Sequence, residues 1–188
     1  MSNPTVVVVE YDPAWPQEFE ALRARVWPVV ADVALRIEHV GSTSVPGLAA
    51  KPIIDMTVVV PARDQVPGAI ERLASLGYVH RGNLGIENRE AFDHPPTLRR
   101  HNLYVCPEGT IGIVNQVAVR DHLRAHPEKA AQYAALKQRL AERHPNDIDA
   151  YVEGKTAFVL GVLRAAGLSA EQLAEIEEDN RPTRPAPP

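Results

Sequence analysis

The alternation of apolar and polar positions divides the chain into a strand-rich first part and a helix-rich second part. Apolar or β-branched runs predict strands at residues 6–9, 34–40, 53–60 and 101–107, with a short one at 78–80. Apolar positions at helical spacing predict helices at 64–76, 110–125, 127–143, 147–166 and 170–178. Another helix is expected from about Pro13 into the low thirties, since Asp12 before Pro13 is a helix-start signal, and Pro28 is expected to kink or split it.

This order of elements predicts an α+β fold. We expect a mixed β-sheet core with flanking helices over residues 1–108, and a helical subdomain over residues 109–178 that packs on this core. Residues 179–188 are polar and proline-rich, which is typical of a disordered tail. Two connections lack periodicity: 41–52 contains two glycines and two prolines, and 82–99 is long enough to be a functional or mobile loop.

Composition narrows the classes of partner. The 188 residues carry a formal net charge of -4, whereas domains that bind extended nucleic acid are usually basic. The single cysteine excludes a disulfide within the chain, so a reducing, cytoplasmic compartment is the expectation. The apolar run at 6–9 is too short for a signal peptide, and no stretch approaches the length of a membrane-spanning helix.

Candidate chemistry lies where two predicted strands adjoin the 41–52 loop. Gly41 and Ser42 directly follow the 34–40 strand, and Thr43 and Ser44 add neutral hydroxyl donors. Because glycine allows the backbone to approach a ligand closely, such a loop suits phosphate oxygens. Asp55 interrupts the next apolar run and could hold a Mg²⁺ ion that bridges those phosphates. The alternative interpretation is an ordinary Gly-Ser turn beside an aspartate that faces water.

A family resemblance supports the phosphate interpretation. A Gly-Ser pair after an apolar strand, followed by an aspartate in the next strand, resembles the signature of DNA polymerase beta-like nucleotidyltransferases. The stretches "HVGSTSVPGLAAKPIIDM", "GIENREAF" and "RRHNLYV" resemble the GrpB family more narrowly, in the same order. The resemblance covers roughly residues 7–166. It implies a nucleotidyltransferase-like core and Gly-Ser contacts to a triphosphate. Some family members are fused to dephospho-CoA kinases, which implies an association with coenzyme A metabolism.

One position departs from the superfamily pattern. The superfamily places a second metal-binding carboxylate two residues after the first, where this chain has Thr57. Residues two apart in a strand share a face, but a hydroxyl cannot replace the charge of a carboxylate. Glu38 or His39 could supply the missing ligand, and since they face opposite sides of their strand, only one of them can. His101 is the third candidate.

Basic residues provide the rest of the candidate site. Arginine and lysine both bind phosphate, and two Tyr-x-x-x-Lys pairs place a tyrosine one helical turn before a lysine. We rank Tyr151 and Lys155 above Tyr133 and Lys137. Alternatively, these pairs stabilise their helices, and the basic residues are solvated charges or, around 120–124, a surface ion-pair cluster. The expected phosphate- or nucleotide-binding residues are Gly41, Ser42, Thr43, Ser44, Lys51, Arg89, His101, Arg120, Tyr151 and Lys155, and Asp55 is the expected catalytic and metal-binding residue.

Two functions are compatible with these residues. The first is an enzyme that binds a nucleotide or related phosphorylated small molecule with Mg²⁺ and transfers a nucleotidyl or phosphoryl group. The second is a non-catalytic module that binds a nucleotide or coenzyme A precursor, or a partner domain for a kinase. Thr57 favours the second function. A purely structural domain is a third interpretation, which leaves Asp55 and its polar loop unexplained.

Overall fold

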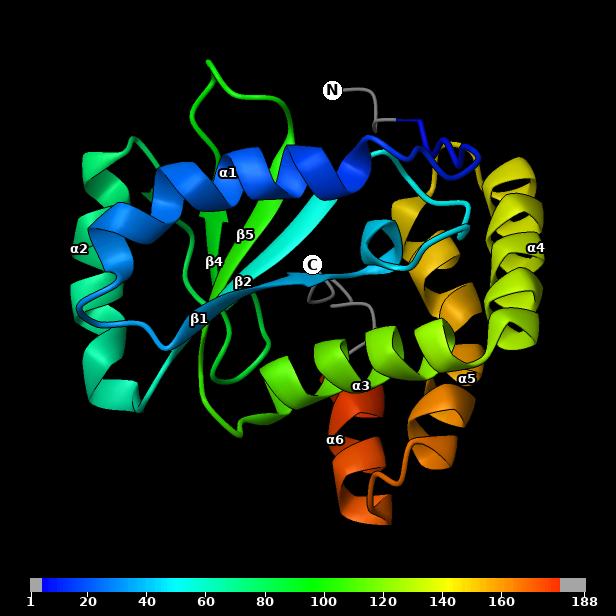
Figure 1. The fold of residues 1–188 in the computed structure, drawn as a ribbon. Helices are drawn as coiled ribbons and strands as arrows, with labels where there is room; N and C mark the ends of the chain where they lie inside the picture. The colour runs from blue at the N-terminus through cyan, green and yellow to red at the C-terminus, as the bar shows by residue number, and fades with distance from the viewer. Residues whose placement is uncertain (1–4, 180–188) are drawn as a thin grey trace, which may run out of the picture.

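The computed structural model describes residues 5–179, and a five-stranded mixed sheet forms its centre (Figure 1). The strand order is β1 (Arg36–Val40), β2 (Ile54–Val60), β5 (His101–Pro107), β4 (Glu90–Asp93) and β3 (Val79–His80). Strands β2 and β5 are parallel, and the other neighbouring pairs are antiparallel. Helices cover the sheet, which confirms the predicted α+β fold with a mixed sheet.

Strand β2 is buried on both faces, which explains its nearly continuous apolar sequence. Met56 and Val58 face helices α1 (Trp15–Val30) and α2 (Val66–Ser75), and they belong to the main hydrophobic core. Successive side chains of a strand alternate between faces, so Asp55 and Thr57 face the opposite layer. The aspartate therefore interrupts the apolar run on one face only.

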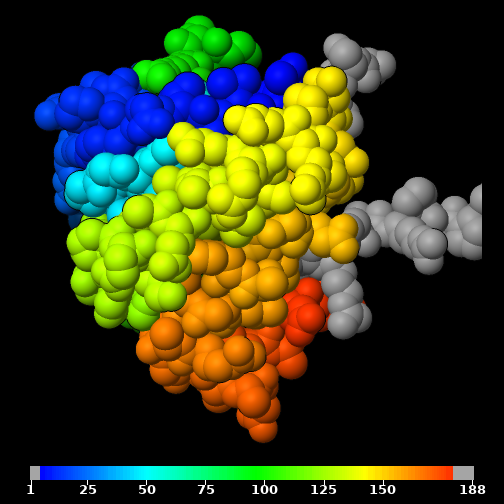
Figure 2. All heavy atoms as spheres, turned by 90° about the vertical axis from the view of Figure 1, so that its right-hand side faces the viewer, coloured from blue at the N-terminus to red at the C-terminus, as the bar shows by residue number. Residues whose placement is uncertain are grey.

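The second layer consists of helices α3 (Ile111–Ala125), α4 (Pro127–Arg143), α5 (Ile148–Ala165) and α6 (Ala170–Asp179). Helix α3 contacts β1, β5 and the helices α4, α5 and α6, and α5 also contacts α4 and α6. Figure 2 shows the side of the molecule formed by α3, α4 and α5, with the segment after β1 between α1 and these helices. Val45 and Leu48 of that segment pack on Leu123 and Tyr133, so the helical layer holds the 41–52 loop in place.

Several predicted element boundaries differ from the structure. Residues 6–9 form no strand, because only Val9 makes a bridge, to Ala50, while Val6 donates to the Pro145 carbonyl and packs on the helical layer. Helix α1 begins at Trp15 rather than Pro13, and it continues through Pro28 without splitting. The unstructured loop expected at 82–99 contains strand β4, which was not predicted because four residues give too short a pattern.

The C-terminal prediction is only partly covered. Asp179, the first residue of the predicted disordered tail, ends α6, and residues 180–188 lie outside the described part of the chain. Within residues 5–179, no helix has the length and apolar character needed to cross a membrane.

Candidate functional site

A polar cavity of about 240 Å³ lies where β1, β2 and β5 meet helices α4 and α5; we call it the inner cavity. The chain segments around it are far apart in sequence, and each contributes one or two polar side chains. It is lined by Gly41, Ser42, Thr43, Ala50, Lys51, Ile53, Asp55, Asn102, Tyr133, Lys137, Tyr151 and Lys155. Seven of the predicted site residues therefore line one cavity: Gly41, Ser42, Thr43, Lys51, Asp55, Tyr151 and Lys155.

Gly41 is required for close approach between the loop and Asp55. Its φ of 69° lies in the left-handed region, and a Cβ atom there would overlap the Asp55 carboxylate. Strand pairing sets this approach, because Val40 is directly opposite Asp55. The polar loop and the carboxylate are therefore one structural unit.

The three hydroxyls after Gly41 have different roles. The Ser44 hydroxyl donates to the Gly41 carbonyl at 2.5 Å, and the Thr43 hydroxyl lies 3.1 Å from His39 Nε2. Both contacts hold the short helical turn at Ser42–Ser44. Ser44 does not line the inner cavity, so it stabilises the loop, whereas Ser42 and Thr43 face the cavity.

Asp55 is the carboxylate of the inner cavity. It pairs with Asn102 across the parallel strands, and Asn102 Nδ2 donates to Asp55 Oδ1 at 2.6 Å. Burial raises the pKa of Asp55, while the Asn102 hydrogen bond and the positive charge of Lys51 act in the opposite direction. The carboxylate is thus poorly solvated and has no salt bridge to a described residue.

Three lysines surround this carboxylate. Burial, together with the nearby charge of Lys155, lowers the pKa of Lys137 to about 7. Burial and the charge of Lys51 lower the pKa of Lys155 to about 8, and burial lowers the pKa of Lys51. Each ammonium group raises the cost of charging the others, so the cluster is a site that an anion would stabilise.

Two tyrosines position the lysine side chains. The Lys137 ammonium lies 4.7 Å from the centre of the Tyr133 ring, and Lys155 lies 4.7 Å from that of Tyr151. Lys51 is 5.8 Å from the same Tyr151 ring. The Lys137 ammonium also donates to the Ala49 carbonyl. Cation–π contacts place the charges but leave most of their N–H groups available for a ligand.

The donor set does not suit two metal ions. Among residues 5–179, no group of three or more His, Cys, Asp or Glu side chains could hold a metal. Of the described residues that line the inner cavity, Asp55 alone is a carboxylate, and three lysines repel a free cation. One Mg²⁺ ion fits only if it arrives with an anionic ligand, because Mg²⁺ can bind through one carboxylate, waters and substrate phosphates.

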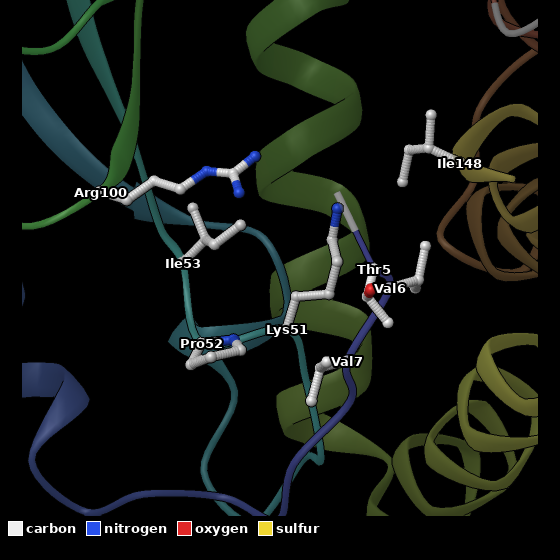
Figure 3. A pocket seen from close by; sticks show the side chains of 8 residues that line it. All are labelled: Thr5, Val6, Val7, Lys51, Pro52, Ile53, Arg100 and Ile148. Atoms are coloured by element: carbon white, nitrogen blue, oxygen red, sulfur yellow. The ribbon is translucent and has the colours of Figure 1, made fainter. Parts of the chain in front are cut away.

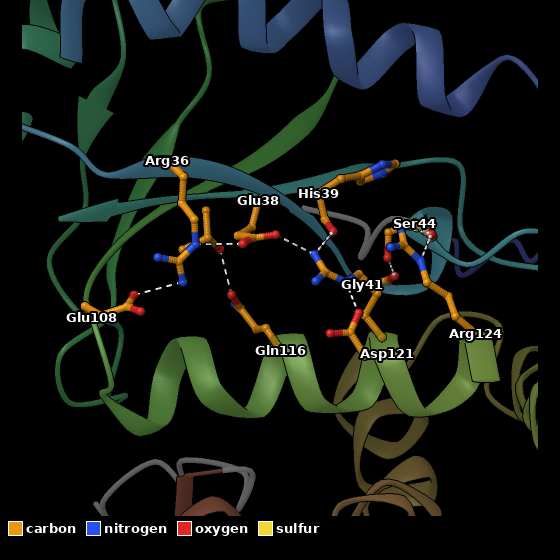
Figure 4. A network of polar contacts seen from close by, with 11 residues as sticks. Arg36, Glu38, His39, Gly41, Ser44, Glu108, Gln116, Asp121 and Arg124 are labelled. Carbon is orange, nitrogen blue, oxygen red and sulfur yellow. Dashed lines mark hydrogen bonds and ion pairs between the residues drawn. The ribbon is translucent and has the colours of Figure 1, made fainter. Parts of the chain in front are cut away.

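The position of the missing second carboxylate is occupied by a hydrogen-bonded side chain. Thr57 is fully buried, and its hydroxyl donates to Gln116 Oε1 of α3 at 2.7 Å. Glu38 lies opposite Thr57 in the strand pairing, on the same face, but it accepts from Arg36 at 2.8 Å and from Arg120 at 2.6 Å (Figure 4). Glu38 is therefore neutralised by two arginines.

Arg120 and Arg124 hold the loop rather than line the inner cavity. Arg120 also donates to the His39 carbonyl at 3.0 Å and pairs with Asp121, but its side chain is only 11% exposed, so this is not the surface cluster that the alternative interpretation expected. Arg124 donates twice to the Ser44 carbonyl, at 2.7 and 3.0 Å. Helix α3 thus fixes the end of β1 and the start of the loop, which corrects the expectation that Arg120 contacts phosphate.

Two further predicted residues lie elsewhere. His101 is on the opposite face of β5, where its ring is 2.8 Å from the Tyr78 hydroxyl and 2.8 Å from the Arg99 carbonyl. His101 is buried beside the Tyr78 and His94 rings, and it does not line the inner cavity. Arg89 stacks over Tyr104 at 4.7 Å and lines a separate cavity of about 60 Å³. His39 stacks on Phe19, so it is not a metal ligand beside Asp55.

Asn102, Lys137 and Tyr133 line the inner cavity, but the sequence had given them no role or a lower rank. Asn102 follows His101, and the choice between them depends on which face of β5 meets Asp55. The Tyr-x-x-x-Lys repeat was a usable signal for the other two, since both pairs place their lysine in the same cavity.

Comparison with known proteins identifies the family. Residues 5–165 match the family model described as GrpB protein, so the chain belongs to the GrpB family. The UPF0157 protein YqkA of Bacillus subtilis is 36% identical over 154 residues, which are 82% of this chain but 45% of YqkA. This chain therefore spans about half the length of that relative. A dephospho-CoA kinase of Mycolicibacterium paratuberculosis is 29% identical over 186 residues, covering 86% of this chain and 46% of the kinase.

Two solved structures place the fold. The conserved protein GrpB from Enterococcus faecalis is 36% identical, with a TM-score of 0.76, covering 85% of this chain and 96% of that one. A chain of the GLD-2/RNP-8 complex is 13% identical, with a TM-score of 0.51, covering 81% of this chain and 59% of that one. This chain therefore shares its α+β fold with that chain of the GLD-2/RNP-8 complex.

Proposed function

We propose that this GrpB-family protein binds the phosphate groups of a nucleotide or a related phosphorylated small molecule in the inner cavity. The observation that supports this function is the convergence of Lys51, Lys137 and Lys155 around a single carboxylate, beside the Gly41 loop. Partly buried ammonium groups with few protein partners bind phosphate strongly, because both charge and hydrogen bonding are then directed to the ligand.

Each residue has a defined part in this proposal. Lys155 and Lys51 bind phosphate oxygens. The Lys137 ammonium, which donates to the Ala49 carbonyl, adds a positive charge to the cavity wall. Ser42 offers a hydroxyl from the loop, whereas the Thr43 hydroxyl contacts His39. Asp55, oriented by Asn102, would hold one Mg²⁺ ion that enters with the ligand. When bound, this ion would neutralise part of the phosphate charge.

The geometry favours binding without turnover over group transfer. Two-metal transfer needs anionic ligands for both ions, and here Thr57 is bonded to Gln116 while Glu38 is paired with two arginines. Dephospho-coenzyme A is included among the candidate ligands because relatives of this chain carry the name dephospho-CoA kinase. The association with coenzyme A metabolism is part of this proposal.

Calorimetric titration with ATP, CTP and dephospho-coenzyme A, each with and without Mg²⁺, tests the site. We expect Lys155→Met to weaken binding of the preferred ligand about tenfold or more, since it removes a charge-assisted hydrogen bond. Asp55→Asn should abolish the increase in affinity that Mg²⁺ causes. The matched controls are Lys129→Met and Asp64→Asn, which change exposed residues distant from the inner cavity.

Two results would contradict the proposal. Equal ligand affinities for Lys155→Met and Lys129→Met would contradict phosphate binding in the inner cavity. An unchanged effect of Mg²⁺ on the affinity of Asp55→Asn would contradict metal binding by Asp55. Release of pyrophosphate from ATP or CTP in the presence of a small acceptor would establish transfer instead of binding alone.

A further inference from the structure

A second cavity adjoins the inner one and shares part of its wall. This outer cavity has a volume of about 260 Å³ and lies between the N-terminal segment, the start of β2 and the start of α5. Lys51 and Ile53 line both cavities. The remaining wall is mainly apolar, with Val6, Val7 and Ile148. Two sites that share a lysine would bind groups that lie close together.

Among the described residues, the two cations of the outer cavity form no salt bridge, although Lys51 also interacts with the Asp55 carboxylate of the inner cavity. Figure 3 shows the charged ends of Lys51 and Arg100 directed toward the same open space, with Ile148 across from them. No acidic side chain lines this cavity, and within residues 5–179 neither cation forms a salt bridge. The neighbouring Arg99, by contrast, pairs with Glu18. Burial lowers the pKa of Lys51, the Asp55 carboxylate raises it and the charge of Arg100 lowers it, so an anion between Lys51 and Arg100 would relieve their repulsion.

We propose that the outer cavity is a second subsite that binds an acidic group, carboxylate or phosphate, attached to an apolar body. Arg100 and Lys51 bind the acidic group, and Val7, Ile148 and Ile53 contact the apolar part. The proposal deepens the function proposed above and rests on it for the neighbouring phosphate site. The acidic group belongs either to the far end of the phosphorylated ligand or to a separate small molecule.

Hexanoate and 1-hexanol are a matched pair of probes, because they share an apolar chain and differ in charge. Amide chemical shifts in the folded full-length protein report where each binds. We expect hexanoate to shift the amide signals of Val7, Ile53 and Arg100 until they reach a plateau. The affinity of 1-hexanol should be lower by a factor of about ten or more. Arg100→Met should reduce hexanoate affinity about tenfold, while Arg99→Met should leave it unchanged.

A second titration separates the two proposals. Arg100→Met should retain pyrophosphate binding in the inner cavity, whereas Lys155→Met should lose it and keep hexanoate binding. Hexanoate that still binds when ATP is saturating assigns the subsite to a separate molecule, and competition assigns it to the far end of the ligand. Equal binding of hexanoate and 1-hexanol, equal effects of the two arginine variants, or shifts without saturation would overturn the subsite.

Discussion

The charged side chains at two ends of one sheet face differ in whether they have ion-pair partners within the protein. Around Thr57, the charges are paired within the protein, since Glu38 binds Arg36 and Arg120, and Arg36 also binds Glu108 at 2.8 Å. Around Asp55, two residues earlier in the same strand, three lysines converge on a carboxylate that accepts a hydrogen bond from neutral Asn102. Paired charges fix the fold, whereas unpaired charges in a cavity are available to a ligand.

This contrast also explains why the face is not a two-metal centre. A second ion would need an anion near Thr57, and the one nearby, Glu38, already has two cationic partners. Desolvation raises the pKa of Glu38, but the Arg120 and Arg36 contacts outweigh it, so that the pKa is lowered overall. The Glu38 carboxylate stays charged and bound to arginine, and these ion pairs stabilise the fold beside the position where a second metal-binding carboxylate was expected.

The largest effect is expected from breaking the paired end. Arg120→Met leaves Glu38 with one cationic partner in a largely buried position, since the Arg120 side chain is 11% exposed and that of Glu38 is 20% exposed. Removing one member of a buried pair costs about 3 kcal/mol of unfolding free energy. Urea denaturation followed by circular dichroism measures this loss.

The control for Arg120→Met is an ion pair at the surface. Arg23 pairs with Glu20 at 3.3 Å, and both side chains are largely exposed. Arg23→Met should change the unfolding free energy by no more than about 0.5 kcal/mol. Equal losses in the two variants would mean that the Glu38 cluster contributes no more than a surface pair.

The unpaired end should respond in the opposite sense. Lys155→Met removes a charge that burial disfavours, so the unfolding free energy should stay the same or rise. Affinity for pyrophosphate should fall by about 1.5–3 kcal/mol, because the lost contact is a hydrogen bond from a charged group. Paired urea denaturation and calorimetric titration test both parts. A variant that loses stability without losing affinity would assign Lys155 to the fold.

The pH dependence of anion binding gives a smaller, graded effect. The pKa of Lys137 is lowered to about 7 and that of Lys155 to about 8, so both ammonium groups lose protons as the pH rises through this range. Affinity for sulfate, whose own charge is constant there, should therefore decrease from pH 7 to above pH 8. Nuclear magnetic resonance titration at fixed ionic strength measures the sulfate affinity at each pH. Lys137→Met should remove the part of the decrease that occurs near pH 7.

The same shift has a predictable sign for stability. Between the folded pKa of about 7 and the ordinary value of 10.5, Lys137 is protonated in the unfolded chain and neutral in the folded one. The unfolded state then binds more protons, so this residue's contribution to the unfolding free energy rises with pH across that window. Comparing wild type with Lys137→Met at both ends of the window isolates this contribution, and a decrease with pH would contradict it.

The sequence was sufficient to predict most of the fold because its patterns are local. Buried strands such as 53–60 and helices opened by proline, such as the one at Pro127, carry their signals within a few residues. The failures are elements whose state depends on distant partners. Residues 6–9 have strand composition, but their partners are Ala50 and Pro145, in separate parts of the chain.

The residues of the candidate site could be predicted where they adjoin Asp55 in a consecutive strand or loop. They could not be predicted where the register between strands determines which side chain faces the cavity. Ser42 and Asp55 were placed together because their strands are consecutive, and Val40 opposite Asp55 brings them close. The sequence favours His101 over Asn102, because the strand pattern does not show which of two successive residues lies on the same face of the sheet as Asp55. The pairing of Arg120 with Glu38 could not be predicted, because it depends on tertiary packing, and Arg120 was therefore expected to bind phosphate.

The smallest effect comes from the boundary between the two ends. Thr57→Val removes the hydrogen bond to Gln116 and leaves a partly buried amide oxygen without its donor, which should cost about 1–2 kcal/mol of unfolding free energy. The double variant Thr57→Val with Gln116→Leu should recover most of this loss, because both polar partners are then absent. Since Thr57 contacts α3 and not the inner cavity, neither variant should alter Mg²⁺-dependent ATP affinity in calorimetric titration. A loss of that affinity in Thr57→Val alone would extend the ligand site into the paired end, because the threonine hydroxyl would then contribute to binding as well as to packing.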